Sequence, residues 1–239
     1  MTDINIIYED EDVLIVDKPA GIVVFNEGKN PSTGSGQFLI DELIKLNQEL
    51  KNAGEAPRYG IAHRLDKDTS GLLLVAKSQK ALIFLQKQFK NRGVEKKYLT
   101  LVTGHIKDDE GVIHTLIGRS PQDPRKQKAY PLEGAAKEGL REAKTSYKTL
   151  ERLKEYTLLE VAIQTGRKHQ IRCHLAHIHH PVAGDKKYGF KDSPIPEGLT
   201  RQFLHASYVK ITLPDGSLQE FNSDLPEDLQ KILNNLEKE

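Results

Sequence analysis

The sequence has almost no cysteine and no long apolar run, and both absences limit the possible class of protein. Its 239 residues include a single cysteine, Cys173, so no disulfide can form within the chain and a reducing compartment is favoured. No apolar run approaches the roughly 20 residues needed to cross a bilayer, and the acidic N-terminus is unlike a secretory signal. These features predict a cytoplasmic protein that does not act on membranes.

Motifs for a nucleotide cofactor or a metal ion are also missing. Residues 26–36 read as a loop rich in Gly, Ser and Asn, but they neither lead from a strand into a G-x-G-x-x-G helix start nor contain Gly-Lys-Ser/Thr. Five histidines lie between residues 169 and 180, without a His-Glu-x-x-His motif or a second cluster of ligands. A histidine tract alone seldom proves a metal site. We therefore expect no cofactor and no metal.

Charge is unevenly distributed along the chain, although the net charge is only +1. Residues 1–60 have a balance of −6 and residues 201–239 a balance of −3, whereas residues 61–200 carry 26 Lys and Arg against 16 Asp and Glu. A basic middle is typical of a protein that binds a polyanion. Exposed lysines and charged helix faces also occur in proteins that bind no nucleic acid. The distribution favours nucleic acid as the partner without establishing it.

The patterns of apolar residues predict an α+β protein. With 37% hydrophobic and 29% charged residues, the chain has an ordinary composition and enough length for a sizeable core. Helices are expected at residues 37–52, 79–92 and 226–238, and a shorter one after Gly166. Strands outnumber them, at residues 4–8, 13–16, 72–76, 95–102, 112–117, 145–153, 156–163 and in a hairpin at 211–221.

The stretch 62–77 is the centre of the chain. An extended entry and a polar turn lead there into a fully apolar strand at residues 72–76. Just before the turn, Arg64 and Asp66 stand two residues apart, and on an extended backbone that spacing directs both side chains to one face. A carboxylate beside a guanidinium, next to a buried strand, is a candidate reactive group. A modest surface ion pair explains the same spacing equally well.

The residues around this pair resemble a known family. His63-Arg64-Leu65-Asp66, followed by Thr69-Ser70-Gly71 and Ala76-Lys77, resembles the central motif of the RluA-type family of pseudouridine synthases. A second signature, Thr-Gly-Arg-x-His-Gln-Ile-Arg-x-His at residues 165–174, matches at every fixed position. Further matches lie at residues 17–21, 97–98, 181–189 and 203–206, and the resemblance runs from about residue 17 to about residue 221. Members often have a histidine a few residues after Gly21, where this chain has Phe25 or its neighbours, and this departure concerns the subfamily more than the function.

The resemblance implies a fold, an activity and a partner. The fold is an α+β pseudouridine synthase fold, with a central mixed, mostly antiparallel sheet, flanking helices and a catalytic cleft. A single two-lobed catalytic domain is expected over residues 1–239, without the S4-type RNA-binding domain that some relatives carry in front. The expected enzyme is a monomer that isomerises uridine to pseudouridine in a ribosomal or transfer RNA stem-loop. Because that reaction is redox-neutral and needs no group donor, no small-molecule cofactor is expected.

By resemblance, three residues carry the chemistry. Asp66 is the essential catalytic group, which attacks the nucleoside or removes a proton from it. Tyr98 lines the uracil site, although a lone tyrosine in a strand is usually ordinary packing. Arg172 is predicted to pair with Asp66, since a neighbouring guanidinium favours the charged form of a buried carboxyl. Whether Asp66 attacks the base, attacks the sugar or acts as a base is left open.

Further residues are expected to bind the RNA. Arg64 would fill the space left by a flipped base or steady the flipped nucleotide. Arg167 and Lys168 lie at the predicted N-terminus of a helix, where phosphate is favoured, and His169 shares a polar side of that helix with Arg172. The basic loop at residues 119–128 suits phosphates or is a solvated connector.

Two other classes of function compete with an isomerase. An RNA-binding protein of the same fold without catalysis would explain the charge distribution, but it would leave both signatures unused. A metal-dependent hydrolase or nuclease needs a cluster of carboxylates or histidines that the sequence does not provide. The sequence therefore favours an isomerase that acts on RNA.

Overall fold

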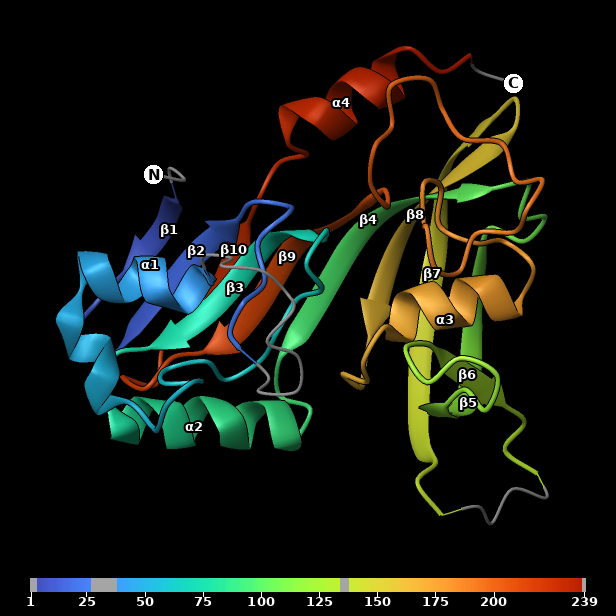
Figure 1. The fold of residues 1–239 in the computed structure, drawn as a ribbon. Helices are drawn as coiled ribbons and strands as arrows, with labels where there is room; N and C mark the ends of the chain where they lie inside the picture. The colour runs from blue at the N-terminus through green and yellow to red at the C-terminus, as the bar shows by residue number, and fades with distance from the viewer. Residues whose placement is uncertain (1–3, 27–37, 134–137, 238–239) are drawn as a thin grey trace. The chain divides into compact units, whose positions relative to one another are not determined.

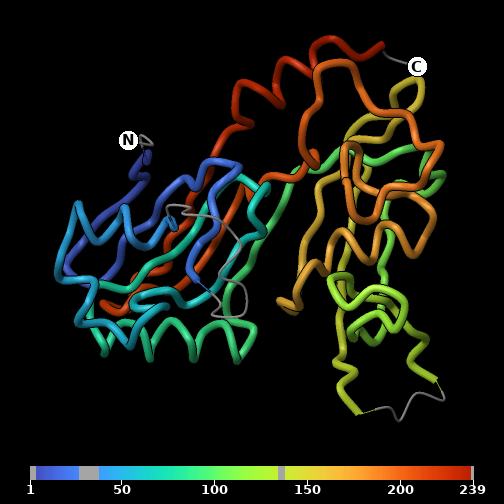
Figure 2. Tube along the Cα trace, viewed as in Figure 1, coloured from blue at the N-terminus to red at the C-terminus, as the bar shows by residue number. Residues whose placement is uncertain are grey.

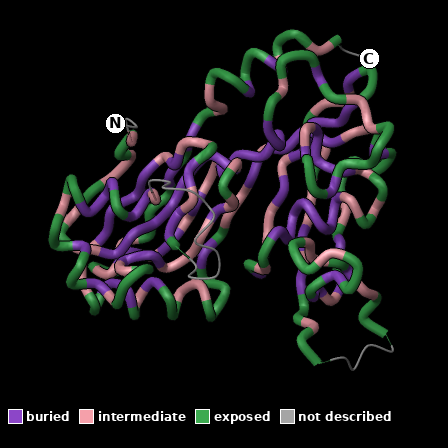
Figure 3. The backbone as a smooth tube through the Cα atoms, in the orientation of Figure 1, coloured by how far each residue is buried: buried purple, intermediate pink, exposed green. Residues whose placement is uncertain are grey.

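The fold is known from a computed structural model, which describes residues 4–26, 38–133 and 138–237. The chain divides into two compact units (Figure 1). Unit 1 comprises Met1–Glu95 and Ala206–Ser223, and unit 2 comprises Lys96–His205 and Asp224–Glu239. Buried residues follow the strands in each unit, while exposed residues lie on the outer turns of the helices (Figure 3).

Unit 1 is organised around one strand that is buried along its whole length. In order across the sheet, its described strands are β1 (Asn5–Glu9), β2 (Val13–Lys18), β3 (Ser70–Ala76) and β9 (Leu204–Thr212), with β10 (Leu218–Asn222) also paired to β9. All residues of β3 are buried, as its apolar sequence predicts. Helix α2 (Gln79–Lys90) packs on this sheet through a core made of Val13, Ile15, Leu72, Leu74, Ala81, Leu82, Leu85, Val209 and Ile211.

Unit 2 contains an antiparallel sheet with two helices packed on it. Across the described strands the order is β4 (Glu95–Thr103), β8 (Tyr156–Ile163), β7 (Arg141–Leu153), β5 (Glu110–Arg119) and β6 (Gln127–Tyr130). Each neighbouring pair is antiparallel. Helix α3 (Gln170–His177) shares a core with Ile117, Ala129, Ala143, Cys173 and Tyr188. Helix α4 (Glu227–Asn234) shares another with Leu101, Leu153, Leu158, Phe203, Leu229 and Ile232.

A long connection joins α3 to β9 and is important for the site. It runs from residue 178 to residue 203 without a helix or a regular strand (Figure 2). Two backbone hydrogen bonds of 2.9 Å attach it to β4: the Ala183 N–H donates to the Leu101 carbonyl, and the Thr103 N–H donates to the Pro181 carbonyl. Because its backbone is anchored in this way, the side chains that it carries are held in defined positions.

The predicted fold class is confirmed, but one helix that was predicted to be continuous is interrupted. Most strands are found within a few residues of their expected ends, in a mostly antiparallel arrangement, but β9 begins at Leu204, before the hairpin expected at residues 211–221. β6 was not expected, and it begins within the basic loop predicted at residues 119–128. Where a single helix was expected at residues 37–52, α1 (Leu39–Leu46) ends and a 3-10 helix (Gln48–Asn52) follows. Asn47 has an extended backbone, and its side-chain oxygen accepts the N–H of Glu49 at 2.9 Å, so it caps the second helix.

The structure corrects the prediction for the C-terminal helix and leaves two other expectations untested. The C-terminal helix is shorter than predicted, and Pro226 stands at its N-cap instead of Ser223 or Asp224. The loop expected at residues 26–36 lies, from residue 27 on, outside the described residues. That the chain forms a single catalytic domain with a cleft stays a prediction.

Candidate active site

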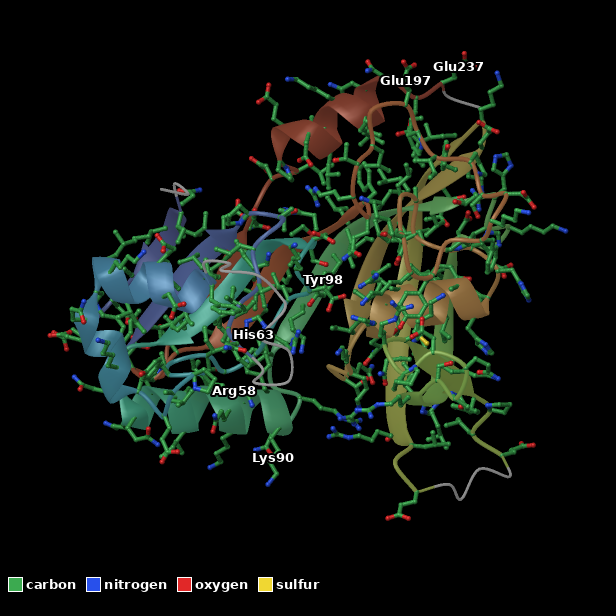
Figure 4. The ribbon with its side chains drawn as sticks, in the orientation of Figure 1. Arg58, His63, Lys90, Tyr98, Glu197 and Glu237 are labelled. Atoms are coloured by element: carbon green, nitrogen blue, oxygen red, sulfur yellow. The ribbon has the colours of Figure 1, made fainter. Side chains whose placement is uncertain are left out.

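The segment that carries Asp66 is anchored to β3 by its backbone and by His63. Ile61 forms an isolated bridge with Val75, and the Ala76 N–H donates to the carbonyl of Gly60 at 2.8 Å. Nε2 of His63 (Figure 4) accepts the backbone N–H of Leu74 at 3.0 Å. These contacts hold the entry to the turn beside the buried strand.

The turn itself is fixed by a hydrogen bond and an aromatic contact. The Thr69 N–H donates to the carbonyl of Asp66 at 3.1 Å, which closes the turn after the candidate carboxylate. The ring of His63 stacks on Phe89 of α2, with ring centroids 4.6 Å apart. The side chain of Asp66 is half-buried at this position. A half-buried carboxylate on a rigid turn can act as a nucleophile or a base.

A buried lysine connects the family match at residues 17–21 to the same turn. The side chain of Lys18 is inaccessible to solvent, and its Nζ donates to the carbonyls of Pro19, Ile22 and Lys67 at 2.7, 3.0 and 3.0 Å. The Gly21 N–H donates to the same Lys67 carbonyl at 2.9 Å. Each of the three N–H bonds of the ammonium therefore has an acceptor, which buried charge requires. The sequence match at residues 17–21 includes this lysine but does not predict its role.

Phe25 orients two arginines, one of which the sequence analysis missed. The Cζ atom of Arg64 lies 5.8 Å from the centroid of the Phe25 ring, and that of Arg58 lies 4.9 Å from it. Phe25 is buried, whereas Arg58 (Figure 4) is exposed. Such cation–π contacts restrict where a guanidinium points. The aromatic residue at the position where relatives often have histidine therefore supports the predicted RNA-binding residue Arg64.

In unit 2, Tyr98 (Figure 4) lies in β4, where it pairs with Val161 of β8 and is 7% exposed. Lys96 stands two residues earlier, so both side chains lie on the same face of the strand. Burial lowers the pKa of Lys96 to about 8. A titratable ammonium next to Tyr98 is a feature that the sequence motif alone did not reveal.

Two residues of the second signature, Thr165 and Gln170, stabilise the turn that leads into α3. The hydroxyl of Thr165 donates to Oε1 of Gln170 at 2.8 Å, and the backbone N–H of Arg167 donates to the same oxygen at 3.0 Å. Nε2 of Gln170 donates to the Lys144 carbonyl at 3.1 Å and to Oγ1 of Thr145 at 2.9 Å. The threonine and the glutamine of the signature therefore hold the turn against β7.

The last histidine of the signature is structural. His174 is inaccessible, with Nδ1 2.8 Å from Oγ1 of Thr145 and Nε2 2.9 Å from Oγ1 of Thr115. Burial lowers its pKa to about 4, so the ring is neutral at pH 7. It joins α3 to two strands of the sheet.

Arg172, the predicted partner of Asp66, has a partner within its own unit. Its Nε and Nη2 donate to Oδ2 and Oδ1 of Asp185 at 2.7 and 2.8 Å, and the two side chains are 7% and 0% exposed. Burial alone would raise the pKa of Asp185, but the hydrogen bonds and the charge of Arg172 lower it. The pairing of Arg172 with Asp66 stays a prediction. Asp185 was visible in the family match at residues 181–189, where its role was not recognised.

The three residues expected to bind RNA around the start of α3 differ in exposure. Lys168 is exposed and Arg167 is half-buried, with its Nε donating to the Glu142 carbonyl at 2.9 Å. His169 is 8% exposed, and its Nδ1 lies 3.0 Å from the hydroxyl of Tyr188. The surface position of Lys168 suits a phosphate contact, whereas the enclosed ring of His169 favours a role in packing over direct contact with RNA.

Among residues 4–26, 38–133 and 138–237, no group of three or more His, Cys, Asp or Glu side chains is placed to hold a metal ion. In the same ranges, no helix has the length and apolar character that crossing a membrane requires. The candidate reactive groups are the carboxylate of Asp66 in unit 1, and the tyrosine Tyr98, the amine of Lys96 and the guanidinium of Arg172 in unit 2. A carboxylate can attack carbon or take a proton, and a guanidinium can stabilise its charge.

Known proteins resemble this chain along most of its length. The pattern of the family described as RNA pseudouridylate synthase matches residues 12–177, a stretch that contains Asp66, Tyr98 and Arg172. A protein of Aquifex aeolicus named as an uncharacterized RNA pseudouridine synthase is 46% identical over 199 residues, which cover 82% of this chain and 59% of that protein. Ribosomal large subunit pseudouridine synthase D of Nitrosomonas europaea is 39% identical over 238 residues, which cover 96% of this chain and 64% of that protein.

The chain thus spans about six tenths of the length of these two relatives. Among solved structures, human RNA pseudouridylate synthase domain containing 1 matches with a TM-score of 0.76 and 26% sequence identity. That match covers 99% of this chain and 89% of the human chain.

Proposed function

The chain belongs to the RluA-type family of RNA pseudouridine synthases, and we propose that it isomerises uridine to pseudouridine in structured RNA with Asp66 as the catalytic carboxylate. The observation that carries this proposal is the rigid, half-buried position of Asp66, on a turn held by Lys18, His63 and Thr69. The name of the Nitrosomonas relative favours ribosomal RNA as the substrate, with transfer RNA as the alternative.

The reaction exchanges one glycosidic bond for another. The C1′–N1 bond of uridine breaks, the uracil turns while it stays bound, and a C1′–C5 bond forms. C5 then loses its proton and N1 gains one, so the balance of atoms and electrons needs no cofactor. Asp66 supplies the carboxylate that attacks the nucleoside or removes a proton from it.

Tyr98 and Arg172 complete the proposed chemistry. Arg172 stabilises the charged form of Asp66, as a guanidinium does for a carboxylate withdrawn from solvent. Tyr98 contacts the uracil and helps to remove the C5 proton. Support comes from the position of both residues in the stretch that matches the family.

RNA binding is proposed to combine base flipping with phosphate contacts. The uridine must leave its stack to reach a carboxylate, and Arg64 steadies the flipped nucleotide or fills the vacated space. Arg167, Lys168 and the basic loop at residues 119–128 bind phosphates, and His169 supports the turn beside them. We place the enzyme in the cytoplasm as a monomer, in agreement with its single, buried cysteine.

Release of tritium from RNA that contains 5-tritiated uridine tests the proposal directly. We expect release by the wild type and none by Asp66→Asn, with RNA affinity kept in the variant. Release by both proteins would remove Asp66 from its role. RNA binding without release by the wild type would favour the alternative, a non-catalytic RNA-binding protein of the same fold. Mapping pseudouridines in RNA from cells with and without the protein would then identify the modified RNA.

A further inference from the structure

We propose that Asp185 is a positioning residue for this reaction, and that it holds the guanidinium of Arg172 in the orientation that the catalytic carboxylate requires. The inference rests on the role proposed above for Arg172 and adds a residue on which that role depends. It follows from the contacts that the loop between α3 and β9 makes with the guanidinium of Arg172.

Asp185 holds one edge of the guanidinium and leaves the opposite end directed elsewhere. Nε and Nη2 of Arg172 donate to the two carboxylate oxygens at 2.7 and 2.8 Å, which is a side-on bidentate pair. This pair uses two of the five N–H bonds of a guanidinium, so the Nη1 end is directed away from Asp185. A second carboxylate can bind at that end while the first edge stays held. Little orientational freedom is then lost when the reacting groups meet.

Asp185 is itself unable to turn. Its Oδ1 also accepts the backbone N–H groups of Lys187 and Tyr188, at 2.8 and 3.0 Å. The preceding residue, Gly184, has a φ of +73°, and a Cβ atom there would collide with the backbone of Arg201. The loop is therefore packed too closely at this point for the carboxylate to follow a moving arginine.

The same loop also contacts the face of the guanidinium. The Cζ atom of Arg172 lies 5.2 Å from the ring centroid of Tyr188. The hydroxyl of Tyr188 accepts the backbone N–H of Gln127 at 2.7 Å and lies 3.0 Å from Nδ1 of His169. Arg172 is thus held at an edge by Asp185 and over a face by Tyr188.

A second bidentate pair in unit 2 provides a comparison. Nε and Nη2 of Arg201 donate to the oxygens of Asp228 at 2.6 and 3.0 Å, but the Asp228 side chain is 56% exposed, whereas that of Asp185 is 0% exposed. Enclosing an ion pair adds a desolvation cost that its attraction often fails to exceed, so stability alone gives little reason to bury one. Orientation of Arg172 does give a reason.

The Asp185→Asn variant keeps the shape of the side chain and removes its charge. We expect kcat for pseudouridine formation to fall about 100-fold, the loss typical of a reacting group displaced by about 1 Å. KM for the RNA should stay within about twofold, because the interaction acts on the chemical step. Asp228→Asn is the matched control and should keep the wild-type kcat. An Asp185→Asn variant with the wild-type kcat overturns the inference alone, while a wild type that forms no pseudouridine overturns the proposed function together with it.

Single-turnover kinetics separate positioning from loss of folded protein. If Arg172 is displaced, every folded molecule reacts more slowly, so the rate constant of Asp185→Asn should fall while the amplitude stays at the wild-type value. Partial unfolding would instead lower the amplitude and leave the rate constant unchanged. A wild-type rate constant with a reduced amplitude overturns the inference.

Discussion

The ammonium group of Lys18 donates a hydrogen bond to the backbone carbonyl of Lys67 at 3.0 Å, directly after the candidate catalytic residue Asp66. The two partners are 49 residues apart in the chain, and Lys18 is inaccessible to solvent. The family match at residues 17–21 therefore supports the turn of the central motif, after Asp66. A buried ammonium is expensive to desolvate unless each of its N–H bonds has an acceptor, and here the acceptors are backbone carbonyls.

Replacing this lysine should destabilise the fold and lower activity together. Lys18→Met keeps much of the apolar stem but removes the donor to the carbonyls of Pro19, Ile22 and Lys67, of which, among the residues that the structure describes, Lys67 alone keeps a second donor, the Gly21 N–H. We therefore expect a loss of about 3 kcal/mol in the free energy of unfolding. The turn before β3 should also become mobile, which lowers kcat. Urea unfolding measures the first effect and tritium release the second. Lys51→Met, at an exposed lysine of the 3-10 helix, should change neither, and a stable, active Lys18→Met would disprove this role.

The neutral state of His174 predicts that stability falls in mild acid. Burial lowers its pKa in the folded protein to about 4, from an ordinary value of 6.5. Between these two pH values the unfolded chain binds more protons than the folded one, so the free energy of unfolding rises with pH from about 4 to 6.5. The full effect of this one group is about 3 kcal/mol. It is lost progressively as pH falls through that window.

Urea unfolding at pH 5 and pH 7 measures this effect. The His174→Gln variant should be less stable than the wild type at pH 7, because its side chain cannot hydrogen-bond to both Thr115 and Thr145. Its stability should also depend less on pH. His179→Asn, at an exposed histidine with a positive φ that asparagine tolerates, should keep the wild-type pH dependence. Equal pH dependence in the wild type and His174→Gln would show that another group is responsible.

The sequence was sufficient to predict those helices and strands whose structure depends mainly on their own residues. The apolar run in β3, the helix that follows Ser78, and the strand–turn–helix of the second signature are found as their sequences predict. Asn47 is a counterexample: its side chain caps the following 3-10 helix, and this local bond ends a helix that the spacing of Leu39, Leu43, Leu46 and Leu50 would continue. Leu46, which that spacing places inside, is 67% exposed as a result.

Partners of the site residues were harder to predict, because they come from distant parts of the chain. The family motif identifies Arg172, but Asp185 reaches it from an irregular loop that has no periodicity to analyse. Similarly, Phe25 contacts Arg58 and Arg64 from a position that was noted only as a departure from the family. Lys18 reads as part of a strand that ends before a proline, and its burial depends on three carbonyls that only the folded chain brings together.

The contact between Phe25 and Arg64 should matter for RNA rather than for folding. Phe25→Leu keeps an apolar side chain but removes the cation–π contact, which is worth about 1 kcal/mol when partly shielded from water. We expect kcat/KM to fall about fivefold. The kcat/KM of Arg64→Gln should be lower still. The double variant should have the same kcat/KM as Arg64→Gln, because both changes remove one shared interaction. Losses that simply multiply would show that Phe25 acts independently of Arg64.

Two variants separate the two roles that we propose for Tyr98. Tyr98→Phe keeps the ring against the uracil and removes the hydroxyl, so we expect RNA affinity to be retained and kcat to fall at least about tenfold if the hydroxyl helps to remove the C5 proton. Tyr98→Leu should lose both contacts. Single-turnover tritium release gives the chemical rate, and a binding titration gives the affinity. Full turnover by Tyr98→Phe would limit Tyr98 to stacking.

Lys168 should contribute to RNA affinity through charge alone. It is exposed at the turn before α3, whereas Lys210, also a basic residue near the surface, forms an ion pair with Glu220 at 2.6 Å. Each phosphate contact releases counterions, so Lys168→Gln should weaken binding equally for cognate and unrelated stem-loops and should reduce the log–log slope of affinity against salt by about 1. Lys210→Gln should leave the slope unchanged, because its charge is already compensated within the protein. A slope that stays at the wild-type value in Lys168→Gln would place the phosphate contact elsewhere, and the basic loop at residues 119–128 would be the next segment to substitute.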